Sequence, residues 1–279
     1  MSDKRFDVQA LFDVRDRTAV ITGGSGHFGR AMALALAQAG ARVAILGRHL
    51  ESAQTVAQAI LAEGGTALGI ACDVLSRASL EQSQEQILNA FGKVDILINA
   101  AGGNSPAATT SSEQSFFDLD TEAINYVFGL NCTGTFQSCQ VFGRGMAERG
   151  QGCIVNVTSM SALRPLTRVP VYGAAKADIA NFTQWLAVHM EQEYSPAIRV
   201  NAIAPGFFLT EQNRYLMVDA HSGAMTQRGQ KIIEHTPMGR LGAPEDLLGT
   251  LLWLVSPAST FVTGTVIPVD GGFSSFSGV

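Results

Sequence analysis

The stretch TAVITGGSGHFG, residues 18–29, runs from β-branched and apolar residues into a glycine-rich turn. Gly24, Gly26 and Gly29 form the pattern GxGxxG, and the helical pattern RAMALALAQAGA follows at once. A turn of this kind lets backbone N–H groups approach a pyrophosphate, and the start of the helix adds the positive end of its dipole. Glycine-rich turns also arise for steric reasons alone, so the position after the first strand of a βαβ unit decides the interpretation. We expect the turn to bind a dinucleotide.

Short apolar runs alternate with longer helical patterns along the rest of the chain. RVAILGR precedes ESAQTVAQAILAEGG, ALGIACDV precedes ASLEQSQEQILNAFG, and further strand-like runs are VDILINAAG, GCIVNVTS, IRVNAIAPG and GTVIPVDGG. This rhythm indicates right-handed crossovers in a parallel sheet, and nearly continuous apolar strands indicate helices on both faces. The sequence predicts one doubly wound α/β (Rossmann) domain over residues 1–279, with about seven parallel strands.

Residues 210–242 interrupt this rhythm between the last two predicted strands. We expect an irregular insertion there, because no clear strand or helix pattern stands out in the segment. Loops of that length are usually functional when they are ordered. The segment is therefore predicted to be a substrate lid.

Composition favours a small-molecule partner. The chain has 279 residues, 46% of them hydrophobic and 15% charged, with a formal net charge of -5 and scattered Lys and Arg. Neither nucleic acid nor an anionic membrane is an expected partner. The amino-terminal stretch mixes charges into its apolar positions, and no run is long enough to span a membrane, so a cytoplasmic location is predicted. The four cysteines lack metal-type spacing and are expected to be reduced and structural, with no metal site: Cys72, Cys132, Cys139 and Cys153.

The end of the second predicted strand bears on the choice of cofactor. A carboxylate there would bind the adenosine ribose hydroxyls, whereas this chain has Gly47-Arg48. Arginine matches a phosphate in geometry and charge, which favours NADP(H), although a solvated arginine is a serious alternative. Further residues expected to contact the cofactor are Ser25, His27, Phe28, Asp73, Val74, Asn99, Ala100, Ala101 and Gly102.

Two side chains at the start of a later predicted helix are candidate catalytic groups. Tyr172 and Lys176 are four residues apart, so on a helix predicted from about 173 to 192 they project from one face. Ser159 closes the strand GCIVNVTS and precedes the tyrosine by thirteen residues. A hydroxyl at a strand end and a phenol at a helix start can therefore converge at the carboxyl edge of the sheet.

These motifs, together with NAAG, LNCTG, YGAAK and APGFFLT, strongly resemble the short-chain dehydrogenase/reductase family over essentially the whole chain. The resemblance implies a catalytic tetrad of Asn131, Ser159, Tyr172 and Lys176. It also implies a nicotinamide site formed in part by Pro205, Gly206, Phe208 and Thr210. One departure is His27, where many members carry glycine; this side chain is expected to cap the turn or touch a phosphate.

The mechanism implied by the resemblance requires a phenol that ionises near neutrality. Lowering the pKa of a tyrosine by three units takes about 4 kcal/mol, which Lys176 and an oxidised nicotinamide would supply as positive charge. Ser159 would hold the substrate oxygen, and Asn131 would anchor a water that links the lysine to solvent.

The sharper resemblance is to the sugar-acid branch of the family, the D-mannonate oxidoreductases or fructuronate reductases. RPLTRVPVYGAAK, APGFFLTEQNR, HTPMGRLG and VDGGFSSFSGV carry it. Expected substrate-binding residues are Asn104, Arg164 and Asn213, beside Ser159 and Tyr172. Asn104 could instead be a turn former, and Arg164 could pair with a nearby carboxylate. Members of this branch generally use NAD(H), which conflicts with Arg48, so both cofactors stay open.

Three other functions compete with this interpretation. Gluconate 5-dehydrogenases share part of the pattern. A 3-oxoacyl carrier-protein reductase would need a basic docking patch that the acidic residues of segment 210–242 do not offer. A dinucleotide-sensing regulator would have no reason to keep the whole tetrad. The resemblance also implies a homo-oligomer, a tetramer in preference to a dimer, paired through the apolar faces of helices around 131–144 and 173–192.

Overall fold

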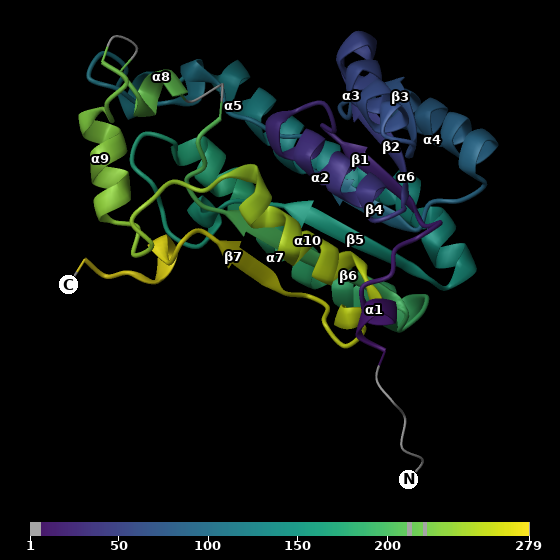
Figure 1. Ribbon diagram of the computed structural model, residues 1–279. Helices are drawn as coiled ribbons and strands as arrows, with labels where there is room; N and C mark the ends of the chain where they lie inside the picture. The colour runs from purple at the N-terminus through teal and green to yellow at the C-terminus, as the bar shows by residue number, and fades with distance from the viewer. Residues whose placement is uncertain (1–6, 211–213, 220–221, 279) are drawn as a thin grey trace.

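The computed structural model describes residues 7–210, 214–219 and 222–278. Seven parallel strands form one sheet in the order β3-β2-β1-β4-β5-β6-β7. Helices cover both of its faces (Figure 1). The predicted doubly wound fold is confirmed. The strands are β1 Thr18–Thr22, β2 Arg42–Gly47, β3 Thr66–Ala71, β4 Ile96–Asn99, β5 Gly152–Val157, β6 Ile198–Pro205 and β7 Val266–Val269.

Two sets of helices pack on the two faces of the sheet. One face carries α2 His27–Gln38, α3 Leu50–Ala62 and α10 Leu248–Val255. The other carries α4 Arg77–Phe91, α5 Thr121–Phe128, α6 Gly134–Arg149 and α7 Pro170–Glu193. The short α1, Val8–Leu11, lies below the amino ends of the strands (Figure 1). Helix α7 starts three residues before the predicted 173, because Pro170 occupies its first turn, where proline needs no hydrogen-bond partner.

The strands read as continuous apolar runs because their side chains fill two cores in alternation. In β1, Val20 packs with the helices α4 to α7, while Ala19 and Ile21 pack with α2 and α10. In β4, Leu97 and Ile98 divide in the same way. Side chains of neighbouring strand residues point to opposite faces, so a strand buried on both faces has no polar side.

The segment 210–242 is more regular than predicted. It contains α8 Arg214–Met217 and α9 Gln227–Glu234, and the hydroxyl of Thr226 accepts a hydrogen bond from the Gly229 N–H (3.1 Å) at the start of α9. Both helices lie beyond the carboxyl ends of β5 to β7 (Figure 1). A small core holds them together, made of Met217, Val218 and Ile232 with Phe207, Leu209, Leu241 and Phe273. The segment is an insertion between β6 and β7, as predicted, but it is not irregular. Sequence analysis missed α9 because its helical pattern is only two turns long.

All four cysteines are buried free thiols, as predicted. Burial raises the pKa of Cys132 and of Cys139 to about 12, which keeps both thiols protonated near neutrality. Within the described residues, no helix combines the length and the apolar character needed to cross a membrane.

Candidate active site

The glycine turn between β1 and α2 is packed at backbone distance. A Cβ atom on Gly29 would lie 2.3 Å from the Gly23 carbonyl oxygen, and one on Gly23 would lie 2.7 Å from the Ala101 Cα. Gly23 also has a φ of +63°, which favours glycine. Gly26 caps α2 without a side-chain hydrogen bond among the described residues, so the first N–H groups of the helix face outward. This geometry fits the pyrophosphate of a dinucleotide.

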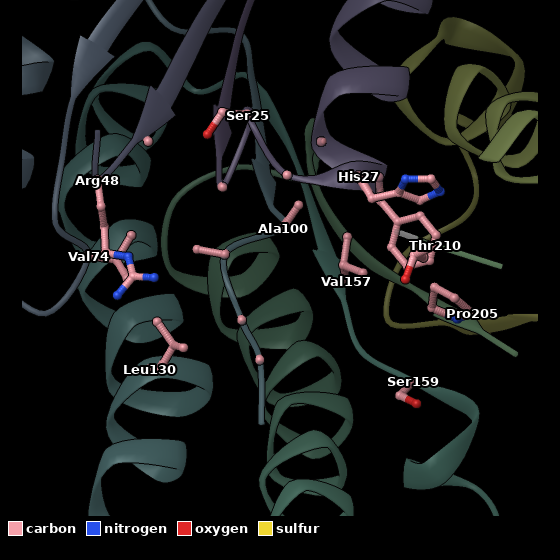
Figure 2. A pocket seen from close by; sticks show the side chains of 18 of the residues that line it. Ser25, His27, Arg48, Val74, Ala100, Leu130, Val157, Ser159, Pro205 and Thr210 are labelled. Atoms are coloured by element: carbon pink, nitrogen blue, oxygen red, sulfur yellow. The ribbon is translucent and has the colours of Figure 1, made fainter. Parts of the chain in front are cut away.

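A cleft of about 480 Å³ opens beside this turn. It lies at the carboxyl edge of the sheet where the strand order reverses between β1 and β4, the usual ligand position in doubly wound folds. Figure 2 shows it extending from Arg48, Val74 and Leu130 at one end to Pro205, Thr210 and Ser159 at the other. The predicted cofactor residues that line it are Ser25, Gly26, His27, Phe28, Gly29, Arg48, Val74, Ala100, Ala101, Gly102, Tyr172, Lys176, Pro205, Gly206 and Thr210.

Four of the predicted cofactor residues lie outside this described lining. Gly24 packs against Ile45 of β2. The side chain of Asn99 points into the core, where its Nδ2 donates to the Asn156 Oδ1 (2.9 Å). Asp73 forms a turn in which its Oδ1 accepts from the Leu75 N–H (3.0 Å). The fourth is Phe208, whose ring packs edge-on against Phe28 at 5.1 Å.

Several lining residues were absent from the sequence prediction. Gly23 is the most informative, because it lies directly before the GxGxxG pattern of Gly24, Gly26 and Gly29 and was left out of it. The positive φ of Gly23 is the reason that glycine is required there, and its place directly after the strand was the available signal. The other additions carry no motif of their own: Gly47, His49, Ser52, Cys72, Gly103, Leu130, Val157 and Thr158.

His27 occupies the first position of α2 and is exposed. Its ring packs edge-on against Phe28, with centroids 5.7 Å apart, and Gly26 rather than His27 is the capping residue. His27 therefore does not cap the helix, and the alternative, that its side chain touches a phosphate, stays a prediction. The side chain does line the cleft near Thr210 (Figure 2).

Arg48 leaves the end of β2 and reaches over the adenosine end of the cleft (Figure 2). Its Nη1 lies 3.5 Å from the hydroxyl of Tyr126, a long and weak contact. Ser25, His49 and Ser52 line the cleft in the same region. Because this corner offers an exposed guanidinium and two hydroxyl groups, it can accept a phosphate as readily as a ribose hydroxyl.

Asn131 lies in a π-helical turn, Gly129–Thr133, between α5 and α6. Its Nδ2 donates to the carbonyls of Gly103 (2.7 Å) and Val127 (2.8 Å), and its Oδ1 accepts from the Gly103 N–H (3.2 Å). The fully buried amide thus ties the loop after β4 to the helix. Single π turns inside helices often mark functional sites. No local pattern in the sequence indicates this π turn.

Lys176 is buried and held by a hydrogen bond from its Nζ to the Val157 carbonyl (2.9 Å). Burial lowers its pKa to about 8. A Cβ on Gly102 would lie 3.0 Å from this Nζ and 2.7 Å from the Asn131 Oδ1, so the bare glycine keeps a gap open between the two polar groups. The lysine Nζ also lies 5.6 Å from the centroid of the Tyr172 ring.

Tyr172 and Ser159 meet as predicted from their positions at a helix start and a strand end. A hydrogen bond with Ser159 lowers the pKa of the phenol, but burial raises it more strongly, and the net direction is upward. The Ser159 hydroxyl in turn accepts from the Ser161 N–H (3.2 Å), which fixes its orientation. In the protein alone the phenol is not made acidic, because Lys176 approaches the ring and bonds to a carbonyl. The lowering of its pKa by Lys176 together with an oxidised nicotinamide stays a prediction.

Two of the predicted substrate residues, Asn104 and Arg164, lie on separate loops of the described chain. Asn104 donates from its Nδ2 to the Thr109 Oγ1 (2.9 Å), as a turn former would. Arg164 is exposed and donates from its Nε to the Ser274 carbonyl (2.9 Å). Asn213 lies outside the described residues. Arg168 has a φ of +74°, and its carbonyl accepts from the Thr110 N–H (2.9 Å), so the loop before α7 is held in a strained conformation.

A cleft of dinucleotide size beside a buried serine and lysine and a half-buried tyrosine, at the switch point of a parallel sheet, defines a Rossmann-fold oxidoreductase that uses a nicotinamide dinucleotide. A family profile described as enoyl-(acyl carrier protein) reductase matches residues 25–274. The uncharacterized oxidoreductase UxuB of Bacillus subtilis is 53% identical, with 94% of this chain and 96% of that protein covered. With these findings, the chain belongs to the short-chain dehydrogenase/reductase family.

Solved structures agree with this assignment. A structure from Haemophilus influenzae, assigned provisionally as a D-mannonate oxidoreductase and containing bound NAD, is 43% identical with a TM-score of 0.91, covering 98% of this chain and 100% of that chain. A gluconate 5-dehydrogenase from Burkholderia cenocepacia, in complex with NADP and tartrate, is 30% identical with a TM-score of 0.86, covering 97% of this chain and 100% of that chain. The enzyme uses a nicotinamide dinucleotide.

Proposed function

We propose that this enzyme interconverts a secondary alcohol and a ketone on a sugar acid, with D-mannonate and D-fructuronate as the pair. The observation that carries the proposal is the similarity, over nearly the full length of both chains, to the Haemophilus structure with bound NAD. A polyhydroxy acid would also suit the loop beside the site: Arg164, five residues after Ser159, is exposed and outside the cleft lining, and it would offer a cation to a carboxylate.

In this proposal the four buried or half-buried polar residues divide the chemistry. The Ser159 hydroxyl donates to the substrate oxygen, while one of its two acceptor lone pairs receives the Ser161 N–H. The Tyr172 phenol gives its proton to that oxygen during ketone reduction and takes it back during alcohol oxidation. Asn131 and Lys176 border the gap over Gly102 and hold the proton path on the side away from the substrate. A bound nicotinamide dinucleotide supplies or accepts the hydride.

The protonation state of the Tyr172 phenol bears on which direction of the reaction is easier. Because the pKa of Tyr172 is raised in the protein alone, the neutral phenol is the resident form and is ready to act as the acid in ketone reduction. Lys176, with a pKa of about 8, is charged at neutral pH and adds positive potential near the ring. We infer that reduction of the keto acid is the easier direction near neutral pH.

Segment 210–242 is proposed to act as the substrate lid. Thr210 lines the cleft, and the small core around Met217 and Ile232 lets α8 and α9 move as a unit. Among the described residues, backbone hydrogen bonds join the base of the segment to the loop after β6: the Gly242 N–H donates to the Phe207 carbonyl (2.8 Å), and the Leu209 N–H donates to the Gly242 carbonyl (3.2 Å). Closure over a substrate would exclude water from the phenol.

The main alternative within the family is a gluconate 5-dehydrogenase. The Burkholderia neighbour contains NADP, and Arg48 at the adenosine end is the residue type that would suit its phosphate. A 3-oxoacyl carrier-protein reductase is less well supported, because the exposed residues of the proposed lid include Asp219 and Glu234. A silent dinucleotide sensor would not need the serine, tyrosine and lysine together.

An initial-rate screen tests the proposal directly. Purified enzyme is assayed with fructuronate, tagaturonate and 5-ketogluconate, each against NADH and NADPH. The proposal expects the highest kcat/KM with fructuronate. Preference for 5-ketogluconate would select the alternative, and turnover of an acyl thioester alone, with none of the three keto acids, would overturn the sugar-acid assignment.

We further propose that the enzyme is a homotetramer paired through α6 and α7. Phe136 and Phe182 stack at 3.6 Å, and the stack continues over Trp185 and His189 along α7. Trp185 is 57% exposed and Val188 is 55% exposed, a large apolar surface for a single chain. Sedimentation of the wild type and of Trp185→Glu tests this; an unchanged mass in the variant would contradict pairing through α7.

A cytoplasmic location is also proposed. The four buried free thiols and the requirement for a nicotinamide dinucleotide both suit a reducing compartment that contains the cofactor. Fractionation of cells that carry a tagged copy at the native locus would check it, with activity recovered in the soluble cytoplasmic fraction as the expected result.

A further inference from the structure

The carboxyl-terminal turn, residues 270–276, closes against the substrate side of the enzyme. It follows β7, and Gly271 and Gly272 reverse the chain with φ values of +65° and +89°. A Cβ on Gly272 would lie 3.1 Å from the ring of Pro237, so the turn is packed against the end of segment 210–242. Figure 1 shows the carboxyl end of the chain beside α9.

One carboxylate holds this turn together. The Oδ1 of Asp270 accepts from the Gly272 N–H (2.9 Å), and its Oδ2 accepts from the Ser274 N–H (2.9 Å). The carbonyl of Asp270 accepts from the Phe273 N–H as well (3.2 Å). Hydrogen bonds to an ionised carboxylate are among the stronger ones, so the position of the Ser274 peptide depends on this single side chain.

The turn touches both the proposed lid and the active-site loop. The ring of Phe273 packs edge-on against Phe207 at 5.0 Å, and Phe207 directly follows Gly206 of the cleft lining. The Ser274 carbonyl accepts from the Nε of Arg164 (2.9 Å), although the two residues are 110 positions apart. Arg164 itself is anchored by its backbone N–H, which donates to the Met160 carbonyl (3.0 Å), one residue after Ser159.

The geometry of the guanidinium makes this contact specific. A guanidinium is planar with five donors, and the Nε edge and the outer Nη1/Nη2 edge point in different directions. The Ser274 carbonyl takes the Nε donor. Among the described residues, no acceptor is bonded to Nη1 or Nη2 of Arg164, and no carboxylate pairs with it. The outer edge is therefore available for a bidentate bond to a carboxylate.

We propose that the Asp270-braced turn is a positioning device for substrate specificity: the Ser274 carbonyl orients Arg164 so that its outer edge receives the carboxylate of the sugar acid. This rests on the proposed function and names the residues that select an acid over a neutral ketose. Asp270 and Ser274 are positioning residues, because they act through Arg164 and touch neither substrate nor cofactor. The turn also links acid recognition to the lid through Phe273.

The test compares a keto acid with its own methyl ester, which has the same carbon skeleton and no charge. With the acid, Arg164→Ala is expected to raise KM about 10- to 100-fold and Asp270→Ala about tenfold, while kcat changes little. With the ester, neither variant is expected to alter KM. In the double variant, Asp270→Ala is expected to add nothing to Arg164→Ala, because the brace has no arginine left to orient.

Two further variants serve as controls that distinguish a specific effect on KM from a general loss of folding. Asp270→Asn keeps the volume of the side chain and should give a smaller KM effect in the same direction. Ser275→Ala, on the exposed side of the same turn, should match the wild type. Thermal melting and NADH binding of all variants show whether the cleft is intact.

Equal KM effects on acid and ester, or additive effects in the double variant, would overturn the inference while leaving the sugar-acid function in place. An unchanged KM for the acid in Arg164→Ala would also overturn the inference and leave the sugar-acid function in place. Absence of wild-type turnover with every keto acid would overturn the proposed function itself, and this assignment with it.

Discussion

The two ends of the cleft are built in different ways. At the glycine turn, backbone packs directly on backbone: Gly29 on Gly23, and Gly23 on Ala101. At the substrate end, single side-chain hydrogen bonds join distant loops, such as the bond from Arg164 to Ser274. The first arrangement tolerates no added atom and serves a cofactor that many enzymes share. The second can change by one residue, which is how one fold accepts many substrates.

The largest expected effect is that of Tyr172→Phe, which should reduce turnover without altering binding at either end of the cleft. Tyr172→Phe removes only the hydroxyl that carries the proton, so kcat should fall on the order of a thousandfold. Because the ring still fills its place against the core, the affinity for the cofactor should stay nearly unchanged. Initial rates and NADH fluorescence titrations measure the two quantities. A variant with near-normal turnover would remove Tyr172 from the mechanism.

A single added methyl group should disrupt the backbone packing of the glycine turn between β1 and α2. Gly29→Ala would place a Cβ 2.3 Å from a backbone oxygen that cannot move independently. We expect the free energy of unfolding to fall by about 3 kcal/mol and cofactor binding to weaken at least tenfold. Urea unfolding and isothermal titration with NADH measure these changes.

Gly249→Ala is the matched control for that substitution. In the described part of the chain, no atom lies within 4 Å of a Cβ built on Gly249, and this residue is in α10. Alanine is the better helix former, so stability should stay equal or rise by up to about 1 kcal/mol. Similar losses in both variants would show that backbone packing at the turn is not special.

Lys176 lies where the two ends meet, and its buried ammonium should appear in the pH dependence of stability. Its pKa is about 8 in the folded protein against 10.5 in the unfolded chain. Between these values the unfolded state binds more protons, so stability rises with pH; the penalty for burying the charge is fully present below pH 8. The free energy of unfolding of the cofactor-free protein should gain about 2 kcal/mol from pH 7 to pH 10 through this residue.

Lys176→Met isolates that contribution. The buried thiols and Tyr172 titrate in both proteins, so the difference between the two unfolding curves at each pH reports the lysine. We expect the variant to be the more stable protein at pH 7 and the difference to shrink by pH 10. A difference independent of pH would mean that the lysine keeps its ordinary pKa in the fold.

The smallest expected effect concerns the adenosine end. Arg48→Ala should lower kcat/KM for NADPH about tenfold, because a charge-assisted bond to the phosphate is lost, and leave kcat/KM for NADH within about twofold. Initial rates with both cofactors decide it. Equal losses would assign Arg48 to adenine packing, and no loss would make it a solvated surface residue.

Sequence reasoning reached the fold and much of the cofactor cleft, and its errors have identifiable causes. Gly23 was missed because glycine spacing alone does not show which glycine has a positive φ. Asn99 was predicted to contact the cofactor, and that stays a prediction; what the sequence did not show is that alternation along β4 turns its side-chain amide into the core toward Asn156. The π turn at Asn131 depends on the Gly103 backbone, a tertiary partner that no local pattern announces.

The amino-acid sequence by itself determined the order of strands and helices, the two-sided burial of the sheet and the place of the glycine turn. These features depend on periodicity and on residues that are neighbours in the chain, so local patterns carry them. Tertiary structure alone decided the raised pKa of Tyr172, the lowered pKa of Lys176 and the orientation of Arg164. Solvent exclusion and contacts over 110 residues set these properties, and both exist only after the chain has folded.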